Sequence, residues 1–84
     1  MIEYKYIKEE CKIIAYVENT KVGECVFCEE NDVWNIVHTS VEKEYRGQGI
    51  AKKLVDEVVK QAQLRGKRVI AECSYAKKVL EGIK

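Results

Sequence analysis

The stretch Val41-Glu-Lys-Glu-Tyr-Arg-Gly-Gln-Gly-Ile-Ala51 decides the fold of this 84-residue chain, because the hydrophobic pattern changes there. Before it, short segments rich in β-branched and aromatic residues alternate with turn residues, which is typical of strands. After it, apolar residues recur at helical spacing. Gly47 and Gly49 lie at the junction. The stretch is therefore expected to be a loop between a strand and a helix.

The residues before this loop predict an antiparallel meander. The expected strands cover residues 2–6, 11–17, 22–28 and 33–41, and the turns between the later ones contain Asn19-Thr20 and Asn31-Asp32. Turns this short join antiparallel neighbours, since a parallel connection needs a dozen or more residues.

The residues after the loop predict a helix over 48–65 with an apolar stripe that comprises Ile50, Leu54, Val58 and Ala62. Gly66 is suited to end this helix. A strand over 68–73 and a final helix over 75–81 follow. A helix that crosses between two parallel strands does so with a right hand. The sequence thus predicts an α+β fold, a mixed sheet with an antiparallel meander followed by a βαβ crossover, in a single domain over 1–84.

The glycine loop is suited to binding phosphate. Glycines at a helix start let the backbone approach an anion closely, and the first N–H groups of a helix have no partner within it. The helix dipole adds partial positive charge at the same place. Arg46 can add charge-assisted hydrogen bonds. The alternative is a purely structural glycine turn at the start of a helix.

Two common nucleotide-binding loops do not fit the stretch. A P-loop needs Gly-x-x-x-x-Gly-Lys-Ser/Thr, which does not occur here. A dinucleotide-binding loop needs a third glycine where Lys52 stands, and a tight turn where the polar connector 42–45 stands. Glu72 mimics the ribose-binding acid of that fold, but the remaining chain is too short for its sheet.

Arg46-x-x-Gly49-x-Ala51 resembles the Arg/Gln-x-x-Gly-x-Gly/Ala motif of the GNAT superfamily of N-acetyltransferases, and Val41 to Leu54 resembles its strand–loop–helix. Lys43 departs from a proline that is frequent in the family at that position. In the family, the motif amides hold the pyrophosphate of coenzyme A (CoA), and the end of the preceding strand pairs with pantetheine. The resemblance implies a phosphate site made of Arg46, Gly47, Gln48, Gly49, Ile50 and Ala51, and a pantetheine site made of Thr39, Ser40 and Val41.

Ordinary GNAT domains are nearly twice as long as this chain. It resembles more closely a small single-domain group with His-Thr before the glycine loop and Cys-Ser/Pro-aromatic after the next strand, here His38-Thr39 and Cys73-Ser74-Tyr75. The resemblance covers residues 13–80. It implies a truncated GNAT-like (acyl-CoA N-acyltransferase) fold and an N-acetyltransferase. Acetyl-CoA would be its co-substrate, and the acceptor a small amine or the lysine side chain of a protein.

His38 and Cys73 are the candidate catalytic residues, with Tyr75 beside them. His38 and Cys73 lie near the carboxyl ends of the two parallel strands, where ligands bind in such sheets. His38 would act as general base or orient Cys73, whose thiolate would take the acyl group. The other route is direct transfer to the amine, with His38 or a water as base. Tyr75 would give a proton to the departing CoA thiolate. The structural alternative is that a lone cysteine packs and a lone histidine is structural.

The other cysteines are expected to be reduced and structural. Cys25-Val-Phe-Cys28 has the spacing of a redox or zinc pair, but strand residues three apart point to opposite faces. His38 is the only histidine, and no second Cys/His pair with zinc spacing follows, so no metal site is expected. Cys11 is expected to head an apolar strand.

Composition limits the partners and the compartment. A formal net charge of +1 argues against a general nucleic-acid binder, which needs a basic excess. No apolar run approaches the ~20 residues of a membrane span. The first residues lack the layout of a signal peptide. We therefore expect a cytoplasmic protein, a monomer or weak homodimer, without nucleic-acid or membrane partners.

Two other functions stay open at the level of sequence. The first is a CoA-binding module without turnover, in which Cys73 forms a mixed disulfide with CoA or the protein only senses CoA. The second is a β-rich interaction domain, motivated by the exposed edges of a short meander.

Overall fold

A computed structural model of the protein describes residues 1–82. The sheet contains β1 (Ile2–Ile7), β2 (Lys12–Val17), β3 (Thr20–Glu30), β4 (Val33–Val41) and β5 (Arg68–Ala71). The helices are α1 (Ile50–Leu64) and α2 (Ser74–Gly82), and two single 3₁₀ turns are η1 (Lys8–Glu10) and η2 (Lys43–Tyr45). None of the helices in this part of the chain is long and apolar enough to cross a membrane.

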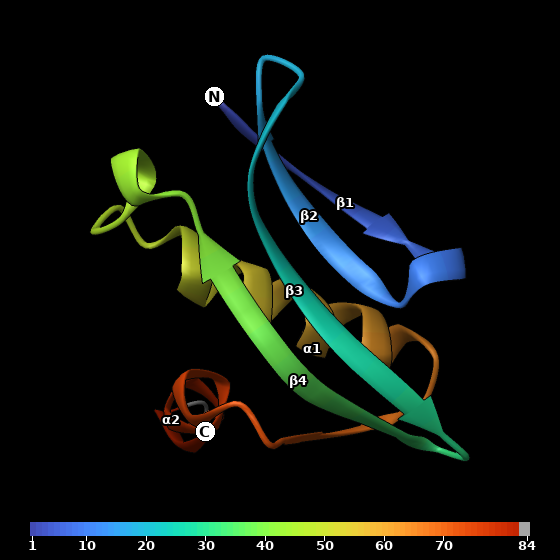
Figure 1. The fold of residues 1–84 in the computed structure, drawn as a ribbon. Coiled ribbons are helices and arrows are strands. Elements are labelled where there is room, and N and C mark those ends of the chain that lie inside the picture. The colour runs from blue at the N-terminus through green and yellow to red at the C-terminus, as the bar shows by residue number, and fades with distance from the viewer. Residues whose placement is uncertain (83–84) are drawn as a thin grey trace.

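The five strands lie in the order β1-β2-β3-β4-β5. The first four pair antiparallel, and β5 pairs parallel to β4. In Figure 1, α1 crosses behind the strands and connects β4 to β5. The predicted α+β fold, a meander followed by a βαβ crossover, is confirmed.

Backbone conformation sets the ends of these elements. Gly47 and Gly49 have φ angles of 81° and 80°, so α1 begins at residue 50 and not at the expected residue 48. Gly66 ends the helix as predicted, with a φ of 69°. Its N–H donates to the Gln63 carbonyl (3.2 Å) and the Lys67 N–H donates to the Ala62 carbonyl (2.8 Å), which satisfies two terminal carbonyls.

The expectation that Cys11 heads a strand is wrong. Cys11 has a φ of 53° and follows η1, with its N–H donating to the Lys8 carbonyl (3.3 Å). The tight connection between β1 and β2 needs one left-handed residue, and here that residue is the cysteine. The strand itself begins at Lys12.

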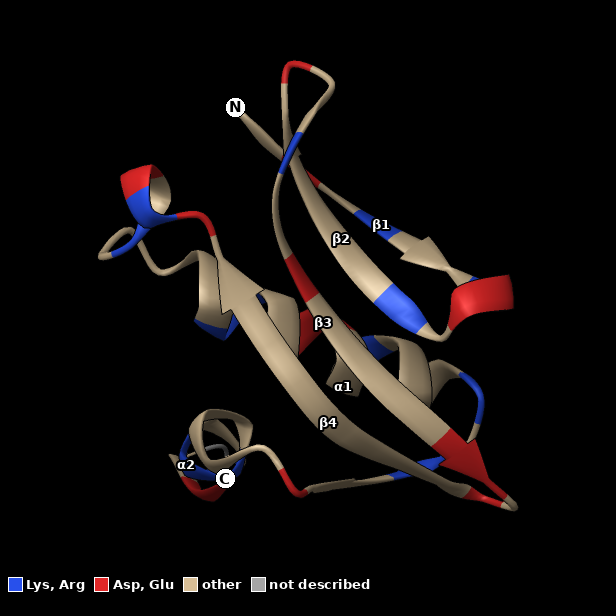
Figure 2. Cartoon of the chain, viewed as in Figure 1, with Lys and Arg blue, Asp and Glu red and all other residues tan. Residues whose placement is uncertain are grey.

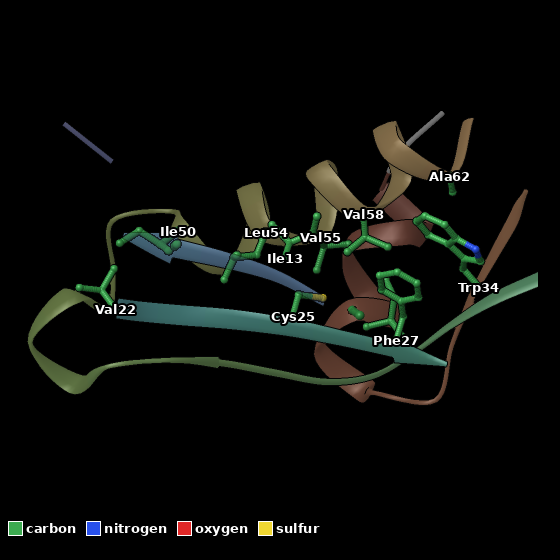
Figure 3. Close-up of a cluster of buried hydrophobic side chains, with 13 residues drawn as sticks. Ile13, Val22, Cys25, Phe27, Trp34, Ile50, Leu54, Val55, Val58 and Ala62 are labelled. Atoms are coloured by element: carbon green, nitrogen blue, oxygen red, sulfur yellow. The ribbon is translucent and has the colours of Figure 1, made fainter. Parts of the chain in front are cut away.

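The core lies between the sheet and α1. Figure 3 shows strand side chains pointing toward the helical stripe that the sequence predicted; the labelled residues are Ile13, Val22, Cys25, Phe27, Trp34, Ile50, Leu54, Val55, Val58 and Ala62. The rings of Phe27 and Trp34 stack with their centroids 4.1 Å apart. Ala76 of α2 is buried in the same cluster, so α2 packs on this face as well. No helix of residues 1–82 covers the opposite face of the sheet.

Gly23 is required by close packing under the end of β4. A Cβ at this position would lie 3.0 Å from the Ser40 carbonyl oxygen and 3.2 Å from Cδ1 of Leu54. We expect Gly23→Ala to lower the free energy of unfolding by about 1–3 kcal/mol, because the β4 backbone and the Leu54 side chain must both give way. Thermal unfolding measures this effect. The control is Gly82→Ala, whose Cβ meets nothing within 4 Å and which should not destabilise the protein. Equal melting temperatures for Gly23→Ala and the unchanged protein would refute the prediction.

Candidate active site

β4 and β5 separate beyond the middle of β4. Their ladder ends at the pair Ile36 and Ala71. The N–H groups of Glu72 and Cys73 both donate to the Ile36 carbonyl (3.0 and 3.1 Å), and the chain then turns into α2. Residues 37–41 of β4 consequently have no partner strand on the β5 side within the described chain. β4 carries no charged residue and is tan throughout in Figure 2.

A β-bulge in β4 changes which side chains face the core. Val26 pairs with His38, and Phe27 pairs with Ile36, so Val37 is the extra residue. Before the bulge, Trp34 and Ile36 are buried against the helices.

After the bulge, it is Thr39 that faces the core. Thr39 pairs with buried Cys25, and their Oγ1 and Sγ atoms are 3.4 Å apart. His38 points to the uncovered face of the sheet and is exposed. Without the extra residue, these two neighbours would exchange faces.

The glycine loop presents unpaired amides at the start of α1. The first hydrogen bond within the helix is from the Lys53 N–H to the Gly49 carbonyl (3.1 Å). The N–H groups of residues 50–52 therefore have no partner in the helix, and Gly49 supplies no side-chain cap. The first turn contains no acidic residue, although acids are favoured there. This helix end therefore presents unpaired N–H donors and the positive end of the helix dipole.

A hollow of about 230 Å³ lies between this helix end, the end of β4 and the start of α2. Its walls are Val41, Tyr45, Arg46, Gly47, Gly49, Ile50, Ala51 and Tyr75. The Arg46 Nε donates to the Val41 carbonyl (3.1 Å), which fixes the loop to the strand and leaves the terminal nitrogens of the guanidinium for a ligand. Tyr75, in the first turn of α2, is 42% exposed and closes one side.

Three of the predicted binding residues, Thr39, Ser40 and Gln48, do not line this hollow. Gln48 lines a second hollow, of about 490 Å³, on the β1 side of the loop. Tyr45 borders both hollows, so it forms the wall between them. Ser40 pairs with Glu24 on the uncovered face and is exposed. The side chains of Gln48 and Ser40 thus do not enter the first hollow.

Cys73 is the N-cap of α2. Its carbonyl accepts the first helical hydrogen bond, from the Lys77 N–H (2.9 Å). Burial raises the pKa of this thiol, but the Ala76 N–H, the Thr39 hydroxyl and the Tyr75 N–H hold the pKa below its ordinary value. A helix N-terminus stabilises a thiolate in this way. The contacts around the Cys73 thiol thus favour its thiolate form.

The structure brings Cys73 to Thr39 and not to His38. The Cys73 Sγ lies 3.8 Å from the Thr39 Oγ1. No hydrogen bond joins His38 to Cys73 among the residues that the structure describes. Sequence reasoning missed the contacts of the Thr39 hydroxyl with the thiols of Cys25 and Cys73, because only the bulge turns Thr39 toward the core. The N-cap position of Cys73 was not predicted, because the helix was expected to begin at residue 75, whereas α2 begins at Ser74.

The remaining cysteines do not form a site. Cys25 is buried and Cys28 is exposed, as the prediction of opposite faces requires. In residues 1–82, no group of three or more His, Cys, Asp or Glu side chains is placed to hold a metal ion.

Comparison with known proteins identifies the family that has this architecture. The family model described as GCN5-related N-acetyl-transferase matches residues 12–82. The chain belongs to the GCN5-related N-acetyltransferase family. The resemblance predicted from the glycine loop is confirmed, and with it the expectation of a GNAT-type acyltransferase at the level of the family. No protein of curated function matches the sequence.

Solved GNAT structures share the fold. A GCN5-like protein from Staphylococcus aureus is 38% identical with a TM-score of 0.73, over 95% of this chain and 78% of that one. The ribosomal-protein-alanine N-acetyltransferase from Brucella melitensis is 23% identical with a TM-score of 0.68, over 93% of this chain and 64% of that one. An N-acetyltransferase from Thermoplasma acidophilum, solved with CoA, is 20% identical with a TM-score of 0.63, over 67% of this chain and 35% of that one. The last two show the fold alone, and this chain spans less than two thirds of each.

Proposed function

We propose that this protein is an acetyl-CoA-dependent acyltransferase that transfers the acetyl group to a small amine or a lysine side chain. The observation that carries the proposal is the position of the Cys73 thiol, at the N-terminus of α2 and beside the opening between β4 and β5. The unpaired N–H donors at the start of α1 lie at the same opening.

The residues around the opening fit CoA. The pyrophosphate would bind the N–H groups of residues 50–52 and the free nitrogens of Arg46. Pantetheine carries amide groups and no charge, which suits the unpaired edge of residues 37–41 in an uncharged strand. When bound, acetyl-CoA supplies the acetyl group as a thioester.

In the proposed reaction, the Cys73 thiolate attacks the thioester carbonyl carbon. The bond from Sγ to carbon forms as the bond from carbon to the CoA sulfur breaks, and Tyr75 donates a proton to the leaving thiolate. The acceptor amine then attacks acetyl-Cys73, and the bond from carbon to Sγ breaks. A base takes the proton that the amine loses.

His38 is proposed as this base acting through a water, because its side chain lies on the uncovered face of β4 while the Cys73 thiol contacts Thr39 on the other face. The acceptor would approach from that face, because α1 and α2 cover the other one. The α2 N-terminus and Thr39 take over the orientation of Cys73 that the sequence had assigned to His38.

Binding and turnover are tested separately. Acetyl-CoA near a millimolar should raise the melting temperature, because only the folded state binds it. The release of CoA thiol is then measured with a panel of small amines and lysine peptides, and turnover of at least one is expected. Binding without turnover would leave a CoA-binding module, and no change in melting temperature would make the glycine loop structural.

A further inference from the structure

We infer that Thr39 is a positioning residue for Cys73, and that buried Cys25 sets the direction of the Thr39 hydroxyl. The three side chains form a row from the core to the site. Cys25 Sγ lies 3.4 Å from Thr39 Oγ1, and Cys73 Sγ lies 3.8 Å from the same oxygen. The sequence-based role of Thr39 was a contact with pantetheine, and the structure gives its hydroxyl another task.

A single hydroxyl can serve both thiols only in one arrangement. Thr39 has one proton to donate and two lone pairs that accept. When Cys73 is a thiolate, it can only accept, so the hydroxyl proton must point to it. Cys25 must then donate its S–H proton to the Thr39 oxygen. The row is Cys25 S–H to Thr39 O–H to Cys73 S⁻.

Burial keeps Cys25 in the protonated form that this row requires. Cys25 is 0% exposed, and burial raises the pKa of its thiol to about 11. The Cys25 thiol therefore stays protonated, and can donate, at neutral pH. Serine at either position keeps a hydroxyl that can donate and so keeps the row. Thr39→Val and Cys25→Ala remove the donor and break it.

Few other titratable groups face the Cys73 thiol. Tyr75 of α2 is adjacent, and Glu72 precedes it. The Glu72 carboxylate accepts a hydrogen bond from the Asn35 Nδ2 of β4 (3.0 Å). α1 contributes apolar side chains to the same core. The hydrogen bond from the Thr39 hydroxyl is thus the side-chain contribution that a substitution can remove.

The test is the rate of alkylation of Cys73 by iodoacetamide as a function of pH, followed by peptide mass spectrometry. Thr39→Val keeps the shape of the side chain but removes the hydroxyl. We expect the midpoint of its pH–rate profile to rise, and its alkylation rate at neutral pH to fall by about three- to tenfold. Thr39→Ser restores the hydroxyl and should react like the unchanged protein. Cys25→Ala should show a smaller rise, and Cys25→Ser none.

A role in packing alone would give a different pattern. Thr39→Val with an unchanged midpoint overturns the inference, and so does an equal shift in Thr39→Ser. A Cys25→Ala midpoint equal to that of the unchanged protein overturns the part assigned to Cys25. Melting temperatures of all four variants show whether each is folded. The inference rests on the proposed use of Cys73, but alkylation needs no CoA, so its failure is distinct from a failure of the proposed function.

Discussion

Replacing Cys73 by serine should abolish the acetyl adduct that the protein forms with acetyl-CoA. The unchanged protein should gain the mass of one acetyl group, on the peptide that contains Cys73. Serine is a good N-cap, so Cys73→Ser keeps the hydrogen bonds at the start of α2. Its hydroxyl is not ionised near neutral pH, and it therefore lacks the nucleophile. Intact and peptide mass spectrometry after an acid quench measures the result.

Cys28 provides the matched control for this experiment. It is an exposed thiol on β3 and does not line the first hollow. Cys28→Ser should form the adduct as the unchanged protein does. An adduct that maps to Cys28 would contradict the assignment of Cys73. If the unchanged protein forms none under any quench while amines are still acetylated, the two-step route is wrong and direct transfer remains.

The substitution Ala51→Glu should weaken CoA binding while it stabilises the fold. Ala51 is the second residue of α1 and lines the hollow. A carboxylate there interacts favourably with the helix dipole, which adds about 0.3–1 kcal/mol to the free energy of unfolding. It also repels a pyrophosphate a few ångströms away, and this repulsion lowers the affinity by about ten- to a hundredfold. Calorimetric titration with CoA and thermal unfolding without it give the two quantities.

The control makes the same change of charge at the other end of the helix. Gln63 is exposed in the last turn of α1, away from the hollow. Gln63→Glu should bind CoA with unchanged affinity. If both variants lose the same affinity, a general effect of net charge explains the result. If Ala51→Glu binds as the unchanged protein does, phosphate is not held at the start of α1.

Local sequence signals were sufficient for the elements and their order. The strands of the meander show alternation of apolar residues, and α1 shows its stripe from Ile50 to Ala62. Gly47, Gly49 and Gly66 all have positive φ angles, which only glycine adopts without strain, so their positions mark a loop and a helix end. Cys11 was misplaced because a left-handed cysteine has no signal in the sequence.

The candidate site was only partly predictable. The sequence predicted an anion site at the start of α1, which stays a prediction, and Cys73 at the end of the strand near it. It paired Cys73 with His38, because both lie near the carboxyl ends of parallel strands. The structure instead places Thr39 against the thiol and His38 on the other face.

The sequence by itself determined the order of strands and helices, the open amides at the glycine loop and the family to which the chain belongs. These properties depend on residues that are neighbours along the chain. Only the tertiary structure decided which side chain of β4 faces Cys73. That choice follows from the bulge at Val37, where the pairing of β4 with β3 slips by one residue. A slip is a property of two strands together, so no pattern within β4 alone could reveal it.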